Sequence, residues 1–442
     1  MSKSSFRSGL FALRTLVPAA LAVALMGSMP AWVQLAHAQS YYSEEQYEEI
    51  WSTEPGSEGI CTELGGATGD LLAACDAIIL SGDEGAATAQ ISGQAAFDAM
   101  AAPVLATYNN VGEIGGQLSG VLADRRGGAS GLSIAGVKIL GKQLNDGKIH
   151  LFEDSAAGAD LDGRLGVFLN GLGGFGSVSA TAQSDGLKFT NGGLIAGMDY
   201  RVRDNVIAGA AFSWIRTDTD YKSNLGSSLS DSYGGTLYAT WWGESAYLDG
   251  MLNYSYADYD MERNFTFPTP TTAKGDTSSN QLFFSMRGGF TLPEEDWMGG
   301  FRFGPQARLD VVKMWMKSYT ETGSAFASTM DKFDVTSVTT NLGGEISYEI
   351  EMESGTFTPR FYALWVHEFE NDAQTLNSRI VLNPTTPITT LLASPDRDFG
   401  RLGVELNWGL SGGISMFLDY EAIVGLKNVE SNQFGIGGRV EF

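Results

Sequence analysis

The chain has 442 residues, with 28 Lys and Arg against 52 Asp and Glu, so its formal charge at pH 7 is −24. That acidity argues against a nucleic-acid partner, because phosphate groups are bound by basic surfaces. Hydrophobic residues make up 43% of the chain and 56 residues are Gly, which excludes wholesale disorder and favours an all-β wall over a helical enzyme.

The first 38 residues have the features of a secretory signal peptide. Three basic residues precede an apolar run over residues 16–26, and Ala36-His37-Ala38 supplies the small-x-small pattern of a cleavage site. The run is too short for a transmembrane helix, which needs about 20 residues. We therefore expect cleavage between Ala38 and Gln39 and export of the mature chain.

A short acidic segment is expected over residues 39–110. Between Gln39 and Asp124 there are 14 Asp and Glu and no Lys or Arg, a composition typical of solvated surface. A disordered acidic tail is expected over residues 41–58, and Ala- and Leu-rich stretches predict short helices over residues 70–80 and 91–109. Pro103 is expected to kink or restart the second of these helices.

Cys61 and Cys75 are the only cysteines of the chain. In an exported protein an even pair favours a disulfide bond between them. A metal site is not expected, because the chain after Gln39 retains only His150 and His367, and neither is near the cysteines.

Residues 111–161 are expected to link the acidic segment to the rest of the chain. Five apolar residues fall on one helical stripe that ends at Arg125-Arg126-Gly127-Gly128, namely Val111, Ile114, Leu118, Val121 and Leu122. Asn109-Asn110 stands just before this stripe, and we interpret the pair as a helix cap.

From residue 162 onward the sequence alternates between apolar and polar or small residues, which is typical of β-strands. The last strand is an example, with Phe434, Ile436, Val440 and Phe442 on one face and Gly435, Gly437, Arg439 and Glu441 on the other. We expect twelve strands, near residues 163–177, 188–201, 205–216, 231–242, 246–258, 277–291, 301–316, 332–350, 356–369, 398–408, 414–424 and 433–442.

Strand length and loop length favour a transmembrane barrel over a soluble sandwich. Most of the expected strands have ten residues or more, whereas soluble strands average about five or six. Short connections alternate with long polar ones, over residues 217–230, 260–276, 317–331 and 371–397. Short turns at one rim and long loops at the other are typical of outer-membrane barrels.

In such a barrel the apolar residues face lipid and the polar residues fill the interior. The alternation therefore predicts a set of lumen-lining residues: Arg201, Arg302, Arg308, Asp310, Arg401, Glu405, Arg439 and Glu441. A charged lining fits a hydrated channel, and dense pairing of these charges fits a plugged interior. The sequence leaves both possibilities open.

From about Asp162 to Phe442 the sequence resembles the autotransporter β-domain, the type V secretion translocator of Gram-negative bacteria. The resemblance is carried by Gly166-Val167-Phe168-Leu169-Asn170-Gly171, by Gly193 to Gly197 running into Asp199-Tyr200-Arg201, by Gly-Gly-Thr-Leu-Tyr at 234–238 and by the terminal Phe. It implies a monomeric twelve-stranded antiparallel up-and-down barrel in outer-membrane lipid.

The resemblance also implies several features outside the wall. A helix is expected to thread the pore, formed by residues 111–126 or by 132–148, and Asn109-Asn110 resembles the scission point of some family members. The closing strand, through Phe434, Ile436, Val440 and Phe442, resembles the signal read by the barrel-assembly machinery, with periplasmic chaperones as further partners. The short acidic segment differs from the long repetitive passengers usual in the family.

Catalytic motifs have simpler interpretations here. Gly409-Leu410-Ser411-Gly412-Gly413 matches G-x-S-x-G, but alternating strands flank it where a nucleophile elbow needs a strand and a helix. We expect no enzyme activity and no cofactor. The leading hypothesis is an outer-membrane translocator and anchor whose N-terminal segment is periplasmic, in the pore or at the surface. The alternatives are a stand-alone pore or surface-structural protein, and a surface hydrolase.

Overall fold

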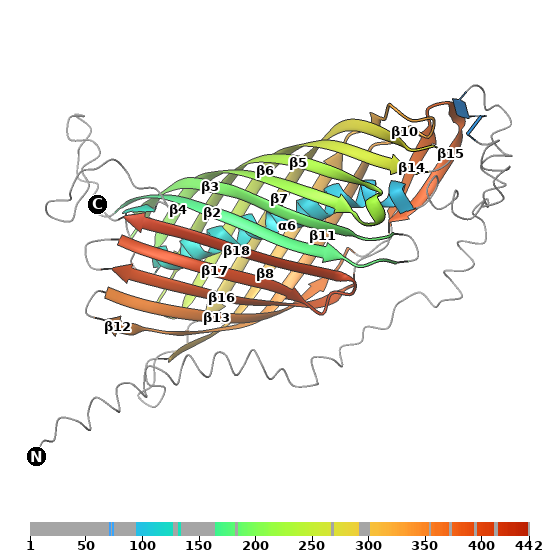
Figure 1. Ribbon diagram of the computed structural model, residues 1–442. Helices are drawn as coiled ribbons and strands as arrows, with labels where there is room; N and C mark the ends of the chain where they lie inside the picture. Colours follow the sequence, from blue (N-terminus) through green and yellow to red (C-terminus); the bar gives the residue numbers. More distant parts are fainter. Residues whose placement is uncertain are drawn as a thin grey trace, which may run out of the picture. The chain divides into compact units, whose positions relative to one another are not determined.

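The computed structural model describes residues 70–71, 73–74, 94–126, 131–133, 164–181, 184–266, 269–290, 301–352, 355–370, 374–392, 396–410 and 414–440. The predicted signal peptide with its Ala38–Gln39 cleavage site, the tail at 41–58, Cys61, Cys75, Glu441 and Phe442 lie outside these residues. Within them, twelve long antiparallel strands close into a barrel around one helix (Figure 1).

The wall of the barrel is formed by strands that each pair antiparallel with the next: β2 (Leu165–Val178), β3 (Leu187–Arg203), β4 (Val206–Tyr221), β5 (Gly226–Trp242), β6 (Ala246–Phe265), β7 (Thr271–Phe290), β8 (Phe301–Met316), β11 (Phe333–Tyr348), β13 (Gly355–Glu368), β16 (Asp398–Leu410), β17 (Ile414–Val424) and β18 (Val429–Val440). The barrel closes where β18 pairs with β2, from Val429 opposite Val178 to Gly438 opposite Leu169. The twelve-stranded barrel predicted from the alternation is confirmed.

Two short strands extend the wall at the end with short turns. β1 (Gly131–Ser133) pairs with the end of β18, and β12 (Ile350–Met352) pairs with the start of β13. A single 3₁₀ turn, η3 (Lys222–Asn224), connects β4 to β5 at the opposite end.

The two faces of each strand are inverted relative to a soluble protein. On β6 the inward-facing Asp249 and Asn253 are buried, while the outward-facing Leu248 and Leu252 are half-exposed. Large apolar side chains on the outside are stable only where lipid covers them. Half-exposed Trp241 and Trp408 lie near the short-turn ends of their strands, and Trp315 and Trp365 near the long-loop ends, as in interfacial girdles.

Several strands continue farther than the sequence predicted. Residues 217–230 and 260–276, expected to be long loops, are largely strand, because β4 reaches Tyr221 and β6 and β7 each have 20 residues. The outward positions beyond Tyr256 carry exposed Asp258 and Asp260 in place of apolar residues. The outward-facing side chains therefore change from apolar to polar where the lipid ends, although the strands remain paired. Because of this change, the sequence predicted loops where the structure has strands.

The predicted loops over residues 317–331 and 371–397 form a second sheet at the long-loop end. It contains β9 (Tyr319–Thr320), β10 (Ser328–Met330), β14 (Gln374–Ile380) and β15 (Asn383–Leu392), in the order β15-β14-β10-β9. The bridge between Lys274 and Thr322 attaches it to β7. We call these four strands the cap sheet (Figure 1).

One continuous helix, α6 (Gln94–Arg126), replaces the two shorter helices predicted over residues 91–109 and 111–124. Its 33 residues rise about 50 Å at 1.5 Å per residue. Pro103 lies inside the helix, and the Thr107 hydroxyl donates a hydrogen bond to the Pro103 carbonyl at 2.9 Å. The segment boundary expected at residue 110 falls inside this helix. Packing of the helix against the wall outweighs the destabilising effect of Pro103 on helix geometry.

Candidate functional site

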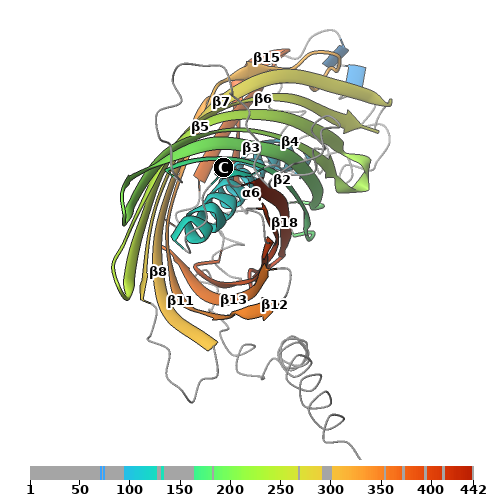
Figure 2. The same ribbon diagram turned by 90° about the vertical axis from the view of Figure 1, so that its left-hand side faces the viewer.

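Helix α6 runs through the interior of the barrel, against one side of the wall (Figure 2). The apolar stripe that the sequence placed over residues 111–122 packs against wall residues that include Phe168, Ile195, Ile215, Tyr238 and Phe283. These wall residues come from β2, β3, β4, β5 and β7. The packing fixes which face of the helix meets the wall and which face remains turned toward the opposite side.

The C-terminal end of α6 is held by buried ion pairs that we call the arginine clamp: Arg125 with Asp199, and Arg126 and Arg287 with Asp249. The Arg125 Nε atom lies 2.6 Å from Asp199 Oδ1, and Arg287 Nη2 lies 2.7 Å from Asp249 Oδ2. Arg126 is ion-paired to the same Asp249 and lies over the ring of Tyr247. Positive charge at a helix C-terminus is also favoured by the helix dipole.

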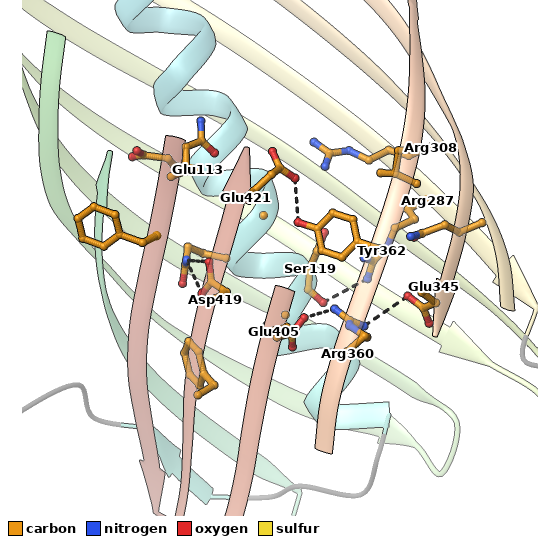
Figure 3. Close-up of a pocket in the computed structure, with 18 residues that line it drawn as sticks. Glu113, Ser119, Arg287, Arg308, Glu345, Arg360, Tyr362, Glu405, Asp419 and Glu421 are labelled. Atoms are coloured by element: carbon orange, nitrogen blue, oxygen red, sulfur yellow. Dashed lines mark hydrogen bonds and ion pairs between the residues drawn. The ribbon is translucent and has the colours of Figure 1, made fainter. Parts of the chain in front are cut away.

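The wall opposite the helix carries a second group of buried charges, and Figure 3 shows one of its ion pairs, between Arg360 and Glu405. Arg308 Nε lies 2.7 Å from Asp310 Oδ1, and Arg401 Nη1 lies 2.7 Å from Glu421 Oε1. Arg360 is ion-paired to Glu405 and lies 3.6 Å from Glu345. Each of these three guanidinium groups has a carboxylate partner, whereas Asp419 on the same wall forms no ion pair among the described residues.

A cavity lies between these ion pairs and the exposed face of α6, with residues of the helix and of strands β7 to β18 around it. Two glycines spaced four residues apart, Gly116 and Gly120, line the cavity from the helix. A Cβ atom on Gly116 would meet nothing within 4 Å, whereas one on Gly115 would lie 2.7 Å from Arg308 Nη2. The glycines therefore leave room between the helix and the charged side chains.

Glu113 is a buried carboxylate in the middle of the lumen. It lies beside Asn191, and both side chains lie over Gly174, where a Cβ atom would come within 2.7 Å of Glu113 Oε1 and 2.6 Å of Asn191 Oδ1. Within the described part of the chain, neither carboxylate oxygen of Glu113 makes a well-formed hydrogen bond. Asp419 is nearby and accepts two hydrogen bonds from Gln117 Nε2, at 2.9 and 3.0 Å.

Asn109 and Asn110 lie in the middle of α6, inside the barrel, so their interpretation as a helix cap is wrong. The Ser431 hydroxyl donates to Asn109 Oδ1 at 3.0 Å, and Gln433 Nε2 lies 3.5 Å from the Asn109 carbonyl oxygen. The Thr217 hydroxyl donates to Asn110 Oδ1 at 3.3 Å. The side-chain nitrogen of Asn109 has no hydrogen-bond partner among the described residues.

At the long-loop end the start of α6 is covered by the cap sheet and by the connection between β2 and β3. Ala99, Met100 and Val104 share one apolar cluster with cap residues Met330 and Leu376. Asp98 is buried beside Ser184, whose hydroxyl donates to its carboxylate. Burial of this carboxyl raises the pKa of Asp98 from 3.8 to about 7.

The predicted lumen-lining residues lie in three different settings. Arg308, Asp310, Arg401 and Glu405 belong to the ion pairs of the charged wall. Arg201 lies over Trp242 near the arginine clamp, and Arg302 is half-exposed at the short-turn rim, where it pairs with Glu349 at 2.9 Å. Arg439 is in β18, but its side chain lies outside the described residues, as does Glu441.

The sequence interpretation missed much of the interior. The missed residues occupy inward positions of predicted strands or of the helix: Glu113, Arg125, Arg126, Asp249, Arg287, Glu345, Arg360 and Glu421. The strand residues could have been found from the sequence, because each continues the alternation of polar and apolar residues in its own strand. Arg125 and Arg126 were predicted as the end of the helix, but their ion pairs with the wall were not.

Part of the closing strand predicted as an assembly signal can also be located. Phe434 and Ile436 point outward from β18 and are half-exposed, while the Val440 side chain and Phe442 lie outside the described residues. Among the helices that the structure describes, none is both long and apolar enough to cross a membrane. Within the same residues, no three His, Cys, Asp or Glu side chains are grouped as a metal site would require.

Comparison with known proteins gives a family match. The family model described as "Autotransporter beta-domain" matches residues 167–421, which is more than half of the chain. Among curated relatives, "Outer membrane protein A" of Rickettsia conorii is 23% identical over 250 residues, covering 53% of this chain. The chain spans only 12% of the length of that relative. A Pseudomonas putida protein described as uncharacterized is 26% identical over 219 residues, which is 48% of this chain and 35% of that protein.

Solved structures with the same fold include the translocator domain of autotransporter NalP from Neisseria meningitidis. It aligns with a TM-score of 0.52 at 14% identity, covering 63% of this chain and 89% of that domain. The β-domain of the Bordetella autotransporter BrkA aligns with a TM-score of 0.48 at 18% identity, covering 63% of this chain and all of that domain. At these identities the first likeness establishes the fold and nothing further.

Proposed function

The chain belongs to the autotransporter β-domain family of outer-membrane barrels, and from that premise we propose that it carries its own N-terminal segment across the outer membrane and then anchors it there. The direction of α6 supports this proposal. Its last turn is clamped near the short-turn rim by Asp199 and Asp249, and its first turns pack under the cap sheet at the long-loop end.

The two rims of such a barrel face different compartments. In bacterial outer-membrane barrels the short turns are periplasmic and the long loops are extracellular. In this orientation the first turns of α6 lie at the extracellular end of the lumen. This orientation of the helix is the observation that carries the proposal, because a segment retained in the periplasm would not need to thread the barrel.

The lining of the lumen fits the passage of an extended polypeptide. The guanidinium groups opposite the helix each have a carboxylate partner, as in the pairs of Arg308 with Asp310 and of Arg401 with Glu421. On that side of the lumen, a passing chain would not be held by an unpaired guanidinium of the described wall residues. We propose that α6 docks against the apolar half of the lumen only when transport is complete.

Insertion of the barrel would require partners. We propose that periplasmic chaperones deliver the monomeric barrel to the barrel-assembly machinery, which reads the closing strand. The outward positions of Phe434 and Ile436 support this, because an edge strand with exposed aromatic and aliphatic side chains is open to recognition before the barrel closes.

Surface labelling of intact cells tests the proposal. An epitope inserted after residue 50 should bind antibody on intact cells, and added protease should remove it without permeabilisation. A periplasmic marker must stay protected in the same cells. An epitope that becomes accessible only after the outer membrane is opened would refute export and favour the stand-alone pore. If the chain were a surface hydrolase acting through Ser411, Ser411→Ala would abolish its esterase activity.

We infer a second candidate function, scission of the chain between Asn109 and Asn110, from their surroundings in the lumen. In this reaction Asn109 Nδ2 attacks its own backbone carbonyl carbon and the peptide C–N bond to Asn110 breaks. A succinimide forms at Asn109, and the proton lost by Nδ2 is transferred to the new amino terminus of Asn110. The unpartnered Nδ2, the Gln433 amide near the Asn109 carbonyl and the carboxylate of Glu113 four residues further along favour this assignment.

Mass spectrometry of the purified barrel tests the scission. The expected product is a fragment whose sequence begins at Asn110, and Asn109→Ala should abolish it because the amide nucleophile is lost. Gly116→Ala, a change farther along the same helix into empty space, serves as the control and should leave the fragment unchanged. A full-length mature chain in the wild-type outer membrane would refute scission without affecting the proposal of export.

A further inference from the structure

We propose that the cap sheet is a docking surface for the helical turn that contains Asp70, Leu71, Ala73 and Ala74 of the same chain, and that it holds this part of the N-terminal segment at the long-loop end of the barrel. The inference rests on the proposed export, because the cap sheet lies at the long-loop end. It adds an attachment at the cap sheet to the packing of α6 inside the lumen.

The docked segment presents one helical face to the barrel. Leu71 is completely buried and Ala74 nearly so, whereas Asp70 and Ala73 are exposed. Two buried positions three residues apart, flanked by exposed Asp70 and Ala73, are typical of a helix that contacts a surface on one side. Aspartate at position 70 and alanine at position 73 leave the other side polar or small.

The surface that receives this face is apolar and comes from four separate parts of the fold. Leu71 and Ala74 form one cluster with Phe265 at the end of β6, Ala273 on β7, Phe326 and Ala327 between β9 and β10, and Ile380 at the end of β14. The rings of Phe265 and Phe326 lie 5.4 Å apart. Phe265 and Ala273 occupy inward-facing positions beyond the part of the wall that lipid covers, so lipid does not reach this cluster and without the segment it would face water.

A buried ion pair beneath the cluster makes the surface rigid. Arg263 Nε donates to Glu321 Oε1 at 2.7 Å, and the Arg263 side chain also lies under the Phe265 ring. Glu321 Oε2 accepts from the Ser328 backbone nitrogen at 2.9 Å, which ties β10 to the same pair. A surface whose side chains are already fixed loses little conformational entropy when it binds, so it is preorganised for a partner.

The β14–β15 hairpin carries two adjacent residues, of which one contacts the docked segment and the other does not. Ile380 is 3% exposed in the cluster, while the adjacent Val381 is 41% exposed at the tip of the same hairpin. The Val381 backbone nitrogen donates to the Ala327 carbonyl at 2.8 Å, so the hairpin is bound to the loop that carries Phe326. Neighbouring residues thus differ in whether they meet the segment, which provides a matched pair for an experiment.

Hydrogen exchange of the full-length purified protein in detergent tests the docking from the side of the segment. Leu71→Asp should raise the amide exchange rate of peptides that cover residues 66–76 at least tenfold, because a charge cannot enter the apolar cluster. Ala73→Asp, on the exposed side of the same turn, should change that rate less than twofold. Equal effects of the two substitutions, or no effect of either, would overturn the proposal.

The same measurement tests whether the surface exists without its partner. Peptides of β14 and β15 should remain as protected in Leu71→Asp as in the wild type, whereas a loss of their protection would mean that no preformed surface exists and would also overturn it. The docking is also tested from the side of the cap sheet. Ile380→Asp should raise the amide exchange rate of peptides that cover residues 66–76 at least tenfold, and Val381→Asp should leave that rate unchanged.

Failure of docking and failure of export give different results. Surface labelling of the epitope after residue 50 reports export in intact cells, and exchange in the purified protein reports docking regardless of how the segment arrived. An accessible epitope together with unchanged exchange in Leu71→Asp would refute docking alone. An inaccessible epitope together with a tenfold rise would refute export and leave the contact itself established.

Discussion

Replacing Asp249 with Asn separates the energy of the arginine clamp from the apolar packing of α6. Asp249 is buried and accepts from Arg126, from Thr240 and twice from Arg287, at 3.0 and 2.7 Å. Asn has nearly the same shape but no charge, so the substitution leaves two buried guanidinium groups without a counter-ion while the helix is docked. When the helix is out, water fills the lumen and hydrates both groups.

The cost therefore falls mainly on the docked state. Removing one partner of a buried ion pair costs about 3–5 kcal/mol. Since about 1.4 kcal/mol changes an equilibrium tenfold, we expect the undocked population to rise by about 100- to 4,000-fold. The matched change Asp231→Asn breaks the exposed pair with Arg216, and such pairs contribute about 0–1 kcal/mol.

Single-channel recording in planar bilayers measures this equilibrium directly. The wild type should conduct rarely, Asp249→Asn should open at least 100 times as often, and Asp231→Asn should behave as the wild type. Deletion of residues 39–130 gives the conductance of the empty barrel for comparison. If Asp249→Asn opened no more often than Asp231→Asn, the clamp would contribute nothing to docking and the reasoning from buried charge would be refuted.

Three further predictions concern other parts of the barrel. Gly116→Ala should stabilise the docked helix by about 1 kcal/mol through helix propensity. Gly115→Ala should not stabilise it, because the new Cβ atom would meet Arg308. The amide exchange rates of α6 measure both effects, and equal effects of the two substitutions would contradict this prediction. Because the pKa of Asp98 is raised, the folded state binds a proton between pH 4 and 7, so stability should fall as pH rises through that range and level off above about 7. Asp98→Asn should remove this slope in thermal unfolding monitored at pH 5 and pH 8, and a slope that persists would assign it to another group. Ile436→Lys, on the lipid-facing side of β18, should lower the yield of heat-modifiable barrel by a factor of ten or more, consistent with about 2–4 kcal/mol for a cation near the bilayer midplane; an unchanged yield would show that this face does not meet lipid.

The wall of the barrel was predictable because its signal is long and local. Each strand places one residue class outward and another inward, so Leu248 and Asp249 reveal their faces without knowledge of any other strand. The strand ends were less predictable. Beyond Tyr256 the outside of β6 is wetted by water, and Asp258 and Asp260 there resemble loop residues even though the backbone remains paired.

The helix was partly predictable for a similar reason. The stripe from Val111 to Leu122 identified the face that packs on the wall, but the sequence also suggested a break near Pro103 and a cap at Asn109-Asn110. Both local signals are overruled by the enclosing barrel. Inside the lumen, backbone groups freed by a break would have few partners, so the helix continues.

Pairing within the lumen could not be predicted, because it depends on how the strands close. Arg360 and Glu405 are adjacent because β13 pairs with β16 in one register, and Arg287 reaches Asp249 from β7 to β6. Alternation identifies these residues as inward-facing but does not give their neighbours. The cap sheet was missed for the same reason, since its strands are separated in sequence by a strand pair of the wall.

The length of β6 has a consequence for what other cells and molecules encounter. Residues 258–265 continue past the last outward-facing aromatic side chain, and at about 3.3 Å per residue and a tilt near 40° they rise about 20 Å above the lipid. In the orientation proposed above, the four strands mounted there would stand clear of the headgroups on the extracellular side. An antibody or a phage fibre approaching the bacterium would therefore meet this platform, and whatever rests on it, before the barrel itself.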